Sequence, residues 1–488
     1  MAERLRVLAG QVLGASGSPA SQVLEGVLHA VSRGRPEYSG LLERNWSGNV
    51  HFNGTPAVPE TIAELRAAVC EGVAPVRVVG RGHSFTELAE CAGGTLISLA
   101  RLNRILNFQE PKLGHLGAIT VEGGTTFSEI ASFLKRRGAL RNLPSCPQFT
   151  VAGAIATGTH GSGVHLQNLA THVREIEFVK ADGSLVTYSR AESPELLEGS
   201  RVHLGCLGVV SKLTLDVVPF YEVHTYLYSE VPQEAAIDAM PELWARCNSL
   251  SIWCLGPDTC YAMFRHFVPH WEPALAVEGH IPHKVLEGTT LVEEMPRLYT
   301  DECEQFVWRP TGQHPWHDGL TLTMEGCRET PIVTADIQAE FFVPLSHAQE
   351  AARTFLDVVR TWTIGSQPNP DGSIAPGFVF AVEFRQIKGD GAWLSPHPVD
   401  SLGLHISFDG RPECWPDVLR AVPLLERALR HFGARAHWGK LAPETFAAPG
   451  HVEQLYGEGL RKFRALCHEH DPEGKFRNAH VQRMLFGA

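Results

Sequence analysis

The sequence is poor in the features that mark membrane-spanning and nucleic-acid-binding proteins. No apolar run in its 488 residues reaches the roughly 20 residues that a membrane-spanning helix needs. Basic residues number 42 against 54 acidic ones, and a formal net charge of −12 argues against a protein that tracks a nucleic-acid backbone. We therefore expect no nucleic-acid and no membrane partner, and an acidic surface that serves solubility.

Cysteines are dispersed, and a metal-binding pattern is missing. The chain holds 11 cysteines without a C-x-x-C pair, so the sequence predicts no metal site. Residues 1–22 make a poor secretory signal, because Arg6 and Gln11 interrupt their apolar part. Reduced thiols and a cytoplasmic location are the expectation. No internal repeat is evident, and the oligomeric state stays open, with a monomer compatible.

The length predicts two domains or more, because a single hydrophobic core stops growing at roughly 250–300 residues. Short strands, turns and helices alternate up to about residue 217, and prolines and aromatics increase after it. We predict an α+β fold with a peripheral arm over 1–40, a first domain over 41–217 and a second, α+β domain over 218–440. The C-terminal segment, 441–488, is expected to return to the first domain.

Hydrophobic periodicity predicts the individual elements. Helices are expected in 61–72, 345–362, 415–433 and 452–470. Residues 94–108 and 118–138 each read as a strand, a turn and a helix. Residues 173–189 predict a hairpin turning at Asp182 and Gly183, and 204–223 predict a further strand pair.

The stretch VRVVGRGHSFTELAE, residues 76–90, places a histidine on a glycine-flanked turn after a buried strand. Gly80 and Gly82 allow the backbone to approach a ligand closely, and successive N–H groups in such a turn can bind an anion. The stretch is neither a GxGxxG fingerprint nor a P-loop. Taken alone, His83 is either an ordinary loop histidine or part of an anion-binding turn.

A second stretch, SCPQFTVAGAIATGTHGSG over 145–163, combines small residues and hydroxyls with almost no charge. A flexible linker is one interpretation. Its apolar residues, such as Val151 and Ile155, instead favour a buried backbone wrapped round a polyphosphate or a flat ring.

Charged pairs mark the second half of the chain. Glu383 and Arg385 in EFR share one face of a predicted strand, as do His405 and Ser407 in LHISF. The first pair is either a structural ion pair or a clamp for a polar substrate. Lys440 in AHWGK, beginning at Ala436, is either a loop lysine or a cation held near developing negative charge.

As an ordered set, these motifs resemble the vanillyl-alcohol oxidase type of flavoproteins, with its PCMH-type FAD-binding fold. Within that type they are similar to the aldonolactone and alditol oxidase branch. GRGHSF, TVAGAIATGTHGSG, SRVHLGCLGVVSKLTLDV, EFR, LHIS and HWGK carry the resemblance, which covers roughly residues 43–485. It implies two domains: a discontinuous FAD-binding domain and a substrate-binding cap.

The resemblance also implies the roles of residues. His83 is expected to bond covalently to the 8α carbon of FAD. Substrate-binding roles fall to Ser145, Glu383, Arg385, His405 and Lys440, of which Glu383, Arg385 and Lys440 are the expected catalytic residues. The cofactor is expected to contact Val78, Val79, Gly80, Arg81, Gly82, Ser84, Ser145, Thr150, Gly153, Thr157, Gly158, Thr159, His160, Val210, Ser407 and His437.

The implied activity is oxidation of a primary alcohol on a polyol or sugar-like substrate, with hydride transfer to flavin N5. Reoxidation by O2 gives hydrogen peroxide. An aldonolactone oxidase, or an oxidase of a bulkier alcohol such as a nucleoside 5′-hydroxyl, would use the same motifs. A surplus segment around 264–298 leaves substrate size open. A dehydrogenase with another acceptor and a flavin-binding protein without turnover are further alternatives.

Overall fold

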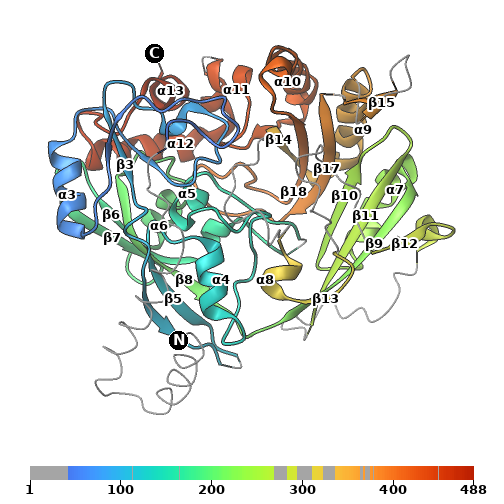
Figure 1. The fold of residues 1–488 in the computed structure, drawn as a ribbon, viewed down its shortest axis with the longest axis horizontal. Helices are drawn as coiled ribbons and strands as arrows, with labels where there is room; N and C mark the ends of the chain where they lie inside the picture. The colour runs from blue at the N-terminus through green and yellow to red at the C-terminus, as the bar shows by residue number, and fades with distance from the viewer. Residues whose placement is uncertain are drawn as a thin grey trace.

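Two bodies lie side by side in the computed structural model (Figure 1). The structure describes residues 42–112, 114–163, 165–268, 283–293, 310–321, 336–362, 366–368, 374–376, 378–448 and 450–487. The predicted arm, 1–40, falls outside these ranges, as do 269–282 and 294–298 of the surplus segment. Among the described helices, none has both the length and the apolar character needed to cross a bilayer.

The first body contains a small parallel sheet and a five-stranded antiparallel sheet. The small sheet has the order β1 (Thr55–Ala57), β3 (Thr95–Ser98), β2 (Val76–Val79). The larger one has the order β4 (Ile105–Gln109), β5 (Gly117–Glu122), β8 (Val209–Val217), β6 (Val173–Val179), β7 (Leu185–Ser189). Its helices are α3 (Ile62–Glu71), α4 (Phe127–Leu134), α5 (Val151–Ala156) and α6 (Pro194–Arg201).

Most of the predicted elements of this body are confirmed. Helix α3 begins after Thr61, whose side chain accepts the Glu64 N–H and so satisfies a donor of the first turn. The β6–β7 hairpin turns at Gly183, which has a φ of +76°. The short helix α5 was not predicted.

Two predictions were wrong. Residues 99–108 hold no helix: β4 pairs with β5, and this pairing supplies the backbone partners that a helix would have provided internally. The strands within 204–223 exist as β8 and the start of β9 (Glu222–Pro232), but they do not pair. They belong to different sheets, so the chain passes here from the first body to the second.

The second body is built on a nine-stranded sheet. Its order is β12 (Thr290–Val292), β9, β11 (Thr259–Val268), β10 (Ser249–Cys254), β17 (Val379–Ile387), β18 (Ser401–Asp409), β14 (Asp336–Pro344), β19 (Arg435–Ala436), and β13 (Gly312–Pro315) also pairs with β9. Its helices are α7 (Gln233–Trp244), α8 (Trp316–Gly319), α9 (Ala348–Val359) and α10 (Trp415–Leu429), and β15 (Ser366–Pro368) and β16 (Ile374–Pro376) form a separate ribbon.

The two faces of the large sheet differ in chemistry. One face is apolar, with Phe384, Leu404 and Ile406 fully buried, and α7 and α9 pack on it (Figure 1). Because side chains alternate along a strand, the intervening residues point to the opposite face. That face carries Glu383 and His405, both buried. A polar row inside a protein is costly unless its members find partners, so it marks the functional face.

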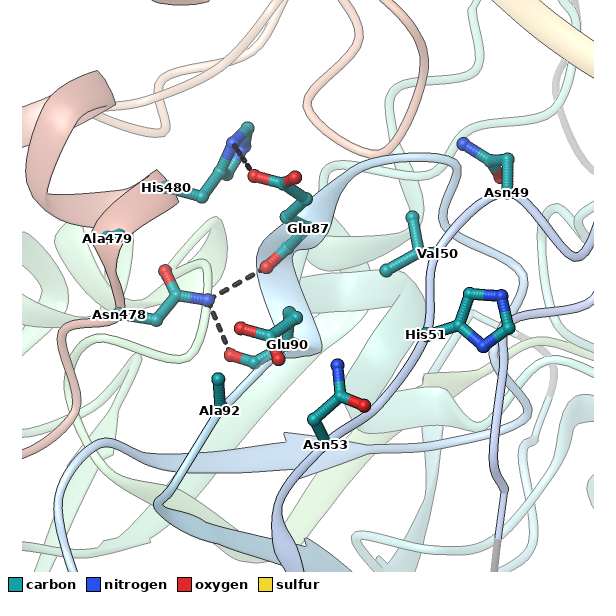
Figure 2. A pocket seen from close by; sticks show the side chains of 10 residues that line it. All are labelled: Asn49, Val50, His51, Asn53, Glu87, Glu90, Ala92, Asn478, Ala479 and His480. Atoms are coloured by element: carbon teal, nitrogen blue, oxygen red, sulfur yellow. Dashed lines mark hydrogen bonds and ion pairs between the residues drawn. The ribbon is translucent and has the colours of Figure 1, made fainter. Parts of the chain in front are cut away.

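After α11 (Pro443–Ala447), which packs on α10 of the second body, the chain returns to the first body through α12 (His451–His470) and α13 (Ala479–Val481) (Figure 1). The Lys475 carbonyl accepts the Val76 N–H at 2.8 Å, which extends the edge of β2. Figure 2 shows Asn478 donating from Nδ2 to the carbonyls of Glu87 and Glu90, at 2.8 and 2.7 Å. The cleft of about 450 Å³ around these contacts contains none of the predicted site residues.

Arg77 joins three distant segments of this body. Its buried guanidinium donates to the carbonyls of Leu88 and Leu204, each at 2.7 Å, and to that of Phe476 at 2.5 Å. Leu88 follows the His83 loop, Leu204 lies in the 202–208 loop and Phe476 lies in the C-terminal segment, so one side chain fixes all three.

We expect Arg77→Ala to lower the free energy of unfolding by roughly 3–5 kcal/mol, because several buried carbonyls lose their donor at once. Denaturant unfolding followed by circular dichroism measures the effect. Arg461→Ala, on the exposed face of α12, is the matched control and should change it by no more than about 0.5 kcal/mol. Equal midpoints for the two variants would contradict this account of the C-terminal return.

Candidate active site

Three titratable residues form one row across the polar face of the large sheet. Glu383 of β17 stands opposite His405 of β18, and His405 stands opposite Glu340 of β14. Directly paired side chains on one face lie about 5 Å apart. Sequence periodicity placed Glu383 and His405 on strands, but only the register shows that they share a row with Glu340.

Glu340 is the centre of an ion cluster. Its side chain is fully buried and lies 2.7 Å from Arg385 Nη2 and 2.8 Å from Lys440 Nζ. His160 Nε2 approaches the same carboxylate at 3.2 Å. Gly403 stands between β17 and β14, and a Cβ there would lie 3.4 Å from Glu340 Oε1. The absence of a side chain at Gly403 thus leaves Arg385 its path to Glu340.

The charges within the cluster depend on one another. Burial alone would raise the pKa of Glu340, but Lys440, Arg385 and His160 together hold it well below its usual range. Burial lowers the pKa of Lys440, and Glu340 opposes that effect. Burial raises the pKa of Glu383 despite Arg385, whose Nε lies 3.3 Å away. Arg385 therefore bridges a carboxylate held firmly ionised and one that takes up a proton more easily.

A hydrogen-bonded chain leads from Lys440 along β18. Lys440 Nζ lies 2.9 Å from His405 Nδ1, and His405 Nε2 lies 3.1 Å from the Ser407 hydroxyl. Burial and the neighbouring Lys440 lower the pKa of His405 to about 3, so its ring is neutral. The network assigns Lys440 as donor to Nδ1 and the Nε2–H as donor to Ser407.

The loop that carries Lys440 is fixed to the first body. His437 Nδ1 accepts the Gly439 N–H at 3.0 Å, and the Gly439 carbonyl accepts the Phe85 N–H at 2.8 Å. A Cβ at Gly439 would lie 3.1 Å from Ser84 Oγ. The predicted motifs GRGHSF and HWGK, more than 350 residues apart in sequence, therefore meet in space.

His160 connects the second predicted motif to the cluster. Its Nδ1 faces the Gly161 carbonyl at 2.7 Å, while its Nε2 faces Glu340. The His437 ring lies 5.9 Å from the His160 ring. Upstream of His160, Thr157 follows α5 directly, and its hydroxyl lies 3.3 Å from that of Thr159.

One trio in the described part of the chain has metal-ligand geometry: atoms of His160, Glu340 and His437 lie within 4.8 Å of one another. The carboxylate in this trio already has two cationic partners, Arg385 and Lys440. A metal ion there would face both positive charges in a medium of low dielectric constant. The donor set is therefore better suited to an ion pair than to a bound cation.

The loop around His83 has the chemistry that covalent attachment needs. The His83 ring lies between aromatic neighbours, 5.7 Å from Trp46 and 4.7 Å from Phe149. Its Nδ1 is buried and has no hydrogen-bond partner among the residues that the structure describes. Burial and the charge of Arg81 lower the pKa of His83 to about 3. The ring is thus neutral, and it carries the free nitrogen lone pair that a bond to carbon requires.

Thr150 joins the two predicted cofactor segments. A Cβ at Gly80 would lie 2.3 Å from Thr150 Oγ1, and one at Gly153 would lie 2.8 Å from the same atom. Gly82 has a φ of +70°, which turns the chain toward His83. The lack of side chains at Gly80 and Gly153 thus lets both segments pack against Thr150 beside His83, a junction that we call the cradle, and its small residues fit a flavin dinucleotide held beside His83.

Other predicted cofactor residues lie on the same elements. Val78 and Val79 end β2, Arg81 and Ser84 flank the turn, and Gly158, with a φ of +69°, follows Thr157. Ser145 is half-buried in the loop that brings Phe149 to His83. Val210 lies apart on β8, where its carbonyl faces Gly123, and no contact described for Val210 joins it to the His83 loop.

Sequence reasoning missed Glu340, the residue with most partners in the cluster. Its signal was present: in the strand DIQAEFFVP, Asp336, Gln338 and Glu340 alternate with apolar residues. An acidic residue on an otherwise core-like strand next to two aromatics could have been marked as a buried charge. Its pairing with Arg385, Lys440 and His160 could not have been foreseen, because these residues come from three other segments of the chain.

Comparison with known proteins gives two family matches. The family described as "FAD binding domain" matches residues 55–189, and the one described as "D-arabinono-1,4-lactone oxidase" matches residues 329–484. A cholesterol oxidase described as solvent-stable has the same fold, with a TM-score of 0.66 at 12% identity over 90% of this chain and 96% of its own. The chain therefore has the two-domain FAD-binding fold, with mixed helix and sheet, that its motifs predicted.

Relatives of known activity cover nearly the whole chain. Alditol oxidase of a Streptomyces species is 32% identical over 91% of this chain and 99% of its own length. L-gulonolactone oxidase of Mus musculus is 33% identical over 92% and 99%. L-gulono-1,4-lactone dehydrogenase of Mycobacterium tuberculosis is 26% identical over 90% and 98%. The chain therefore belongs to the alditol oxidase and aldonolactone oxidase family of FAD-dependent oxidoreductases.

Proposed function

We propose that this protein oxidises the primary alcohol of a polyol or sugar-like substrate to an aldehyde, with O2 as the electron acceptor and H2O2 as the second product. The observation that carries the proposal is the buried Glu383–Arg385–Glu340–Lys440 cluster on the face where the FAD-binding motifs meet the large sheet. When bound, FAD supplies the acceptor for the hydride that leaves the alcohol carbon. The relatives that oxidise alditols and aldonolactones support this reaction class.

Glu383 and Arg385 bind the substrate hydroxyls in this proposal. Glu383 forms an ion pair with Arg385 and lies in the weaker field of Arg265, so part of its carboxylate is available to accept a hydroxyl hydrogen bond. Arg385 donates to substrate oxygen from the same face. Ser145 holds a further hydroxyl from the first body. Groups held by strands of a sheet are well positioned, which lowers the cost of orienting the reacting carbon.

Lys440 supplies positive charge where negative charge develops during the reaction. Glu340 raises the pKa of that ammonium against the lowering effect of burial. His405, neutral and in contact with Lys440, accepts one of its hydrogens and so fixes the direction of the remaining ones. The alcohol oxygen also loses a proton: Lys440 can pass one of its own protons to Nδ1 of the neutral His405 and take up the alcohol proton in its place, so that the proton is held on His405.

His83 binds FAD covalently in this proposal, with Gly80, Gly82 and Thr150 forming the cradle around the dinucleotide. The neutral ring with a partnerless Nδ1 supports the assignment. Val210 would contact the cofactor from β8 by its backbone. An aldonolactone substrate is the second candidate, favoured by the match of residues 329–484 to the arabinonolactone oxidases.

The substrate class is tested by offering the holoenzyme xylitol, sorbitol, gulonolactone and nucleosides in air. We expect H2O2 formation to be fastest with an alditol, because the clamp presents both a hydroxyl acceptor and a hydroxyl donor. Peroxide from gulonolactone alone would favour the second candidate. Dye reduction without peroxide, by all four substrates, would contradict an oxidase.

We expect His83→Ala to release the flavin on acid precipitation, whereas the unmodified protein should keep yellow colour in the pellet. The reason is the loss of the single ring nitrogen positioned for the bond. Absorbance of pellet and supernatant measures it, and His51→Ala, an exposed histidine of the same segment, is the control. A yellow pellet from His83→Ala would refute the attachment site.

Glu340→Gln tests the electrostatic role of the central carboxylate. Glu340 raises the pKa of Lys440 against burial, so removing its charge lowers that pKa further and Lys440 loses its proton at lower pH. We expect the alkaline limb of kcat to move to lower pH, with kcat reduced roughly 10–100-fold.

The control for this variant is Asp336→Asn, which removes a buried carboxylate from the same strand. Asp336 raises the pKa of Lys440 less than Glu340 does, so the limb should move less. An unchanged alkaline limb in Glu340→Gln, with Lys440→Met inactive, would show that Glu340 does not support the protonated lysine.

A further inference from the structure

The polar face of the large sheet continues beyond the clamp. Glu383 of β17 stands opposite Trp253 of β10, and Arg385 stands opposite Ser251. Two residues further along β10, Ser249 stands opposite Arg265 of β11, which in turn stands opposite Thr225 of β9. Because paired residues share a face, Thr225, Arg265, Ser249 and Trp253 all lie on the face that carries Glu383. We call these four residues the distal patch.

The distal patch is buried but its polar atoms lack partners. Thr225 and Ser249 are each 1% exposed, Trp253 is 6% and Arg265 is 7% exposed. Within the described part of the chain, Thr225 Oγ1, Ser249 Oγ, Trp253 Nε1 and Arg265 Nε have no hydrogen-bond partner. Buried polar groups are almost always paired, so four groups without partners on one face of the sheet need an explanation. A polar ligand that satisfies them in the working enzyme provides one.

Arg265 also forms no ion pair with any other residue that the structure describes. Burial lowers its pKa to about 10, so the guanidinium still carries its charge at neutral pH. Glu383 is the acidic group whose field acts on it, but that carboxylate lies beside Arg385. Glu383 and Glu340 therefore each have Arg385 as a cationic partner already. Arg265 places a further positive charge on the same face of the sheet.

A purely structural role is not visible for this guanidinium. Arg77 shows what such a role looks like in this chain, since it is equally buried and donates to the carbonyls of three segments. Arg265 has no comparable acceptor among the described residues. A buried cation without a partner costs free energy, and an anionic ligand offsets that cost when it binds.

The position of the patch fixes how a ligand would lie. Strands β11 and β17 are separated by β10, so their backbones are about 10 Å apart. The long side chains of Arg385 on β17 and Arg265 on β11 shorten the distance between their charged ends, so a ligand with the length of a sugar chain can contact both. A substrate with its reacting hydroxyl near Lys440 and its middle hydroxyls at Glu383 and Arg385 therefore has its far end beside Arg265.

We propose that the distal patch is a subsite for an anionic terminus, a carboxylate or a phosphate ester, on the end of the polyol substrate opposite the oxidised hydroxyl. This inference rests on the proposed alcohol oxidation and narrows its substrate class to acidic sugar alcohols. Arg265 pairs with the anion, and Thr225, Ser249 and the Trp253 N–H donate to its oxygens or to the neighbouring hydroxyl.

The test compares three six-carbon ligands on the holoenzyme: neutral sorbitol, D-gluconate with a carboxylate and sorbitol 6-phosphate with a phosphate. Isothermal titration of the dithionite-reduced holoenzyme under anaerobic conditions measures binding, because reduced FAD accepts no hydride, and peroxide formation by the oxidised holoenzyme in air measures turnover. We expect at least one of the two anions to bind roughly 10-fold tighter than sorbitol or more, because it forms charge-assisted hydrogen bonds. Which anion gains more identifies the terminus.

Arg265→Gln removes the charge and keeps hydrogen-bonding capacity, and Arg461→Gln on α12 is the matched control for net charge. Arg265→Gln should lower affinity and kcat/KM for the preferred anion roughly 10–100-fold through KM, with sorbitol unchanged. Arg265→Met should keep or raise the melting temperature, because an unpaired buried charge is removed.

Equal losses for sorbitol and both anions in Arg265→Gln, or anions that bind no better than sorbitol to the unmodified enzyme, would overturn the subsite. A lowered melting temperature in Arg265→Met, with anion affinity retained in Arg265→Gln, would show that Arg265 has a structural role instead.

The binding comparison does not require turnover. If sorbitol is oxidised without any preference for anions, only the subsite fails. If the anions bind through Arg265 but no alcohol is oxidised, the proposed function fails.

Discussion

The ion pairs of Glu340 are the constraint on which the site depends. A carboxylate without solvent access is tolerated only because Arg385, Lys440 and His160 surround it, and these come from β17, the HWGK loop and the segment after α5. Each partner is also buried, and Glu340 raises the pKa of both Arg385 and Lys440 against the effect of burial. Removing Glu340 would leave Lys440 without its ion-pair partner in a medium where unpaired charge is expensive.

This mutual dependence explains how two bodies make one site. His160 belongs to the FAD-binding part of the chain and Glu340 to the large sheet, so their contact crosses between the bodies. The backbone bond from Phe85 to Gly439 joins the same two parts beside His83. Polar contacts, in addition to apolar packing, therefore fix the distance between the cofactor cradle and the substrate clamp.

The sequence allowed much of the fold to be predicted, because local signals were strong. The capped helix after Thr61 and the hairpin at Gly183 follow from local propensity. The strand within residues 99–108 does not follow from local propensity, because β4 exists only where β5 lies beside it. The same limit applies to the site. Glu383 and Arg385 were found from their spacing on one strand, whereas Glu340 and the distal patch depend on strand order.

By itself, the sequence determined the kinds of residues: a glycine-flanked histidine, a small-residue backbone segment, a Glu-x-Arg pair and a lysine after a tryptophan, in an order that resembles one flavoprotein family. It also determined which strand faces are polar, because side chains alternate along a strand. Only the tertiary structure decided which of these residues meet. Glu340 stands opposite His405, and Arg265 stands two strands from the clamp, because non-local pairing sets the strand order and register. No local pattern in the chain specifies that pairing.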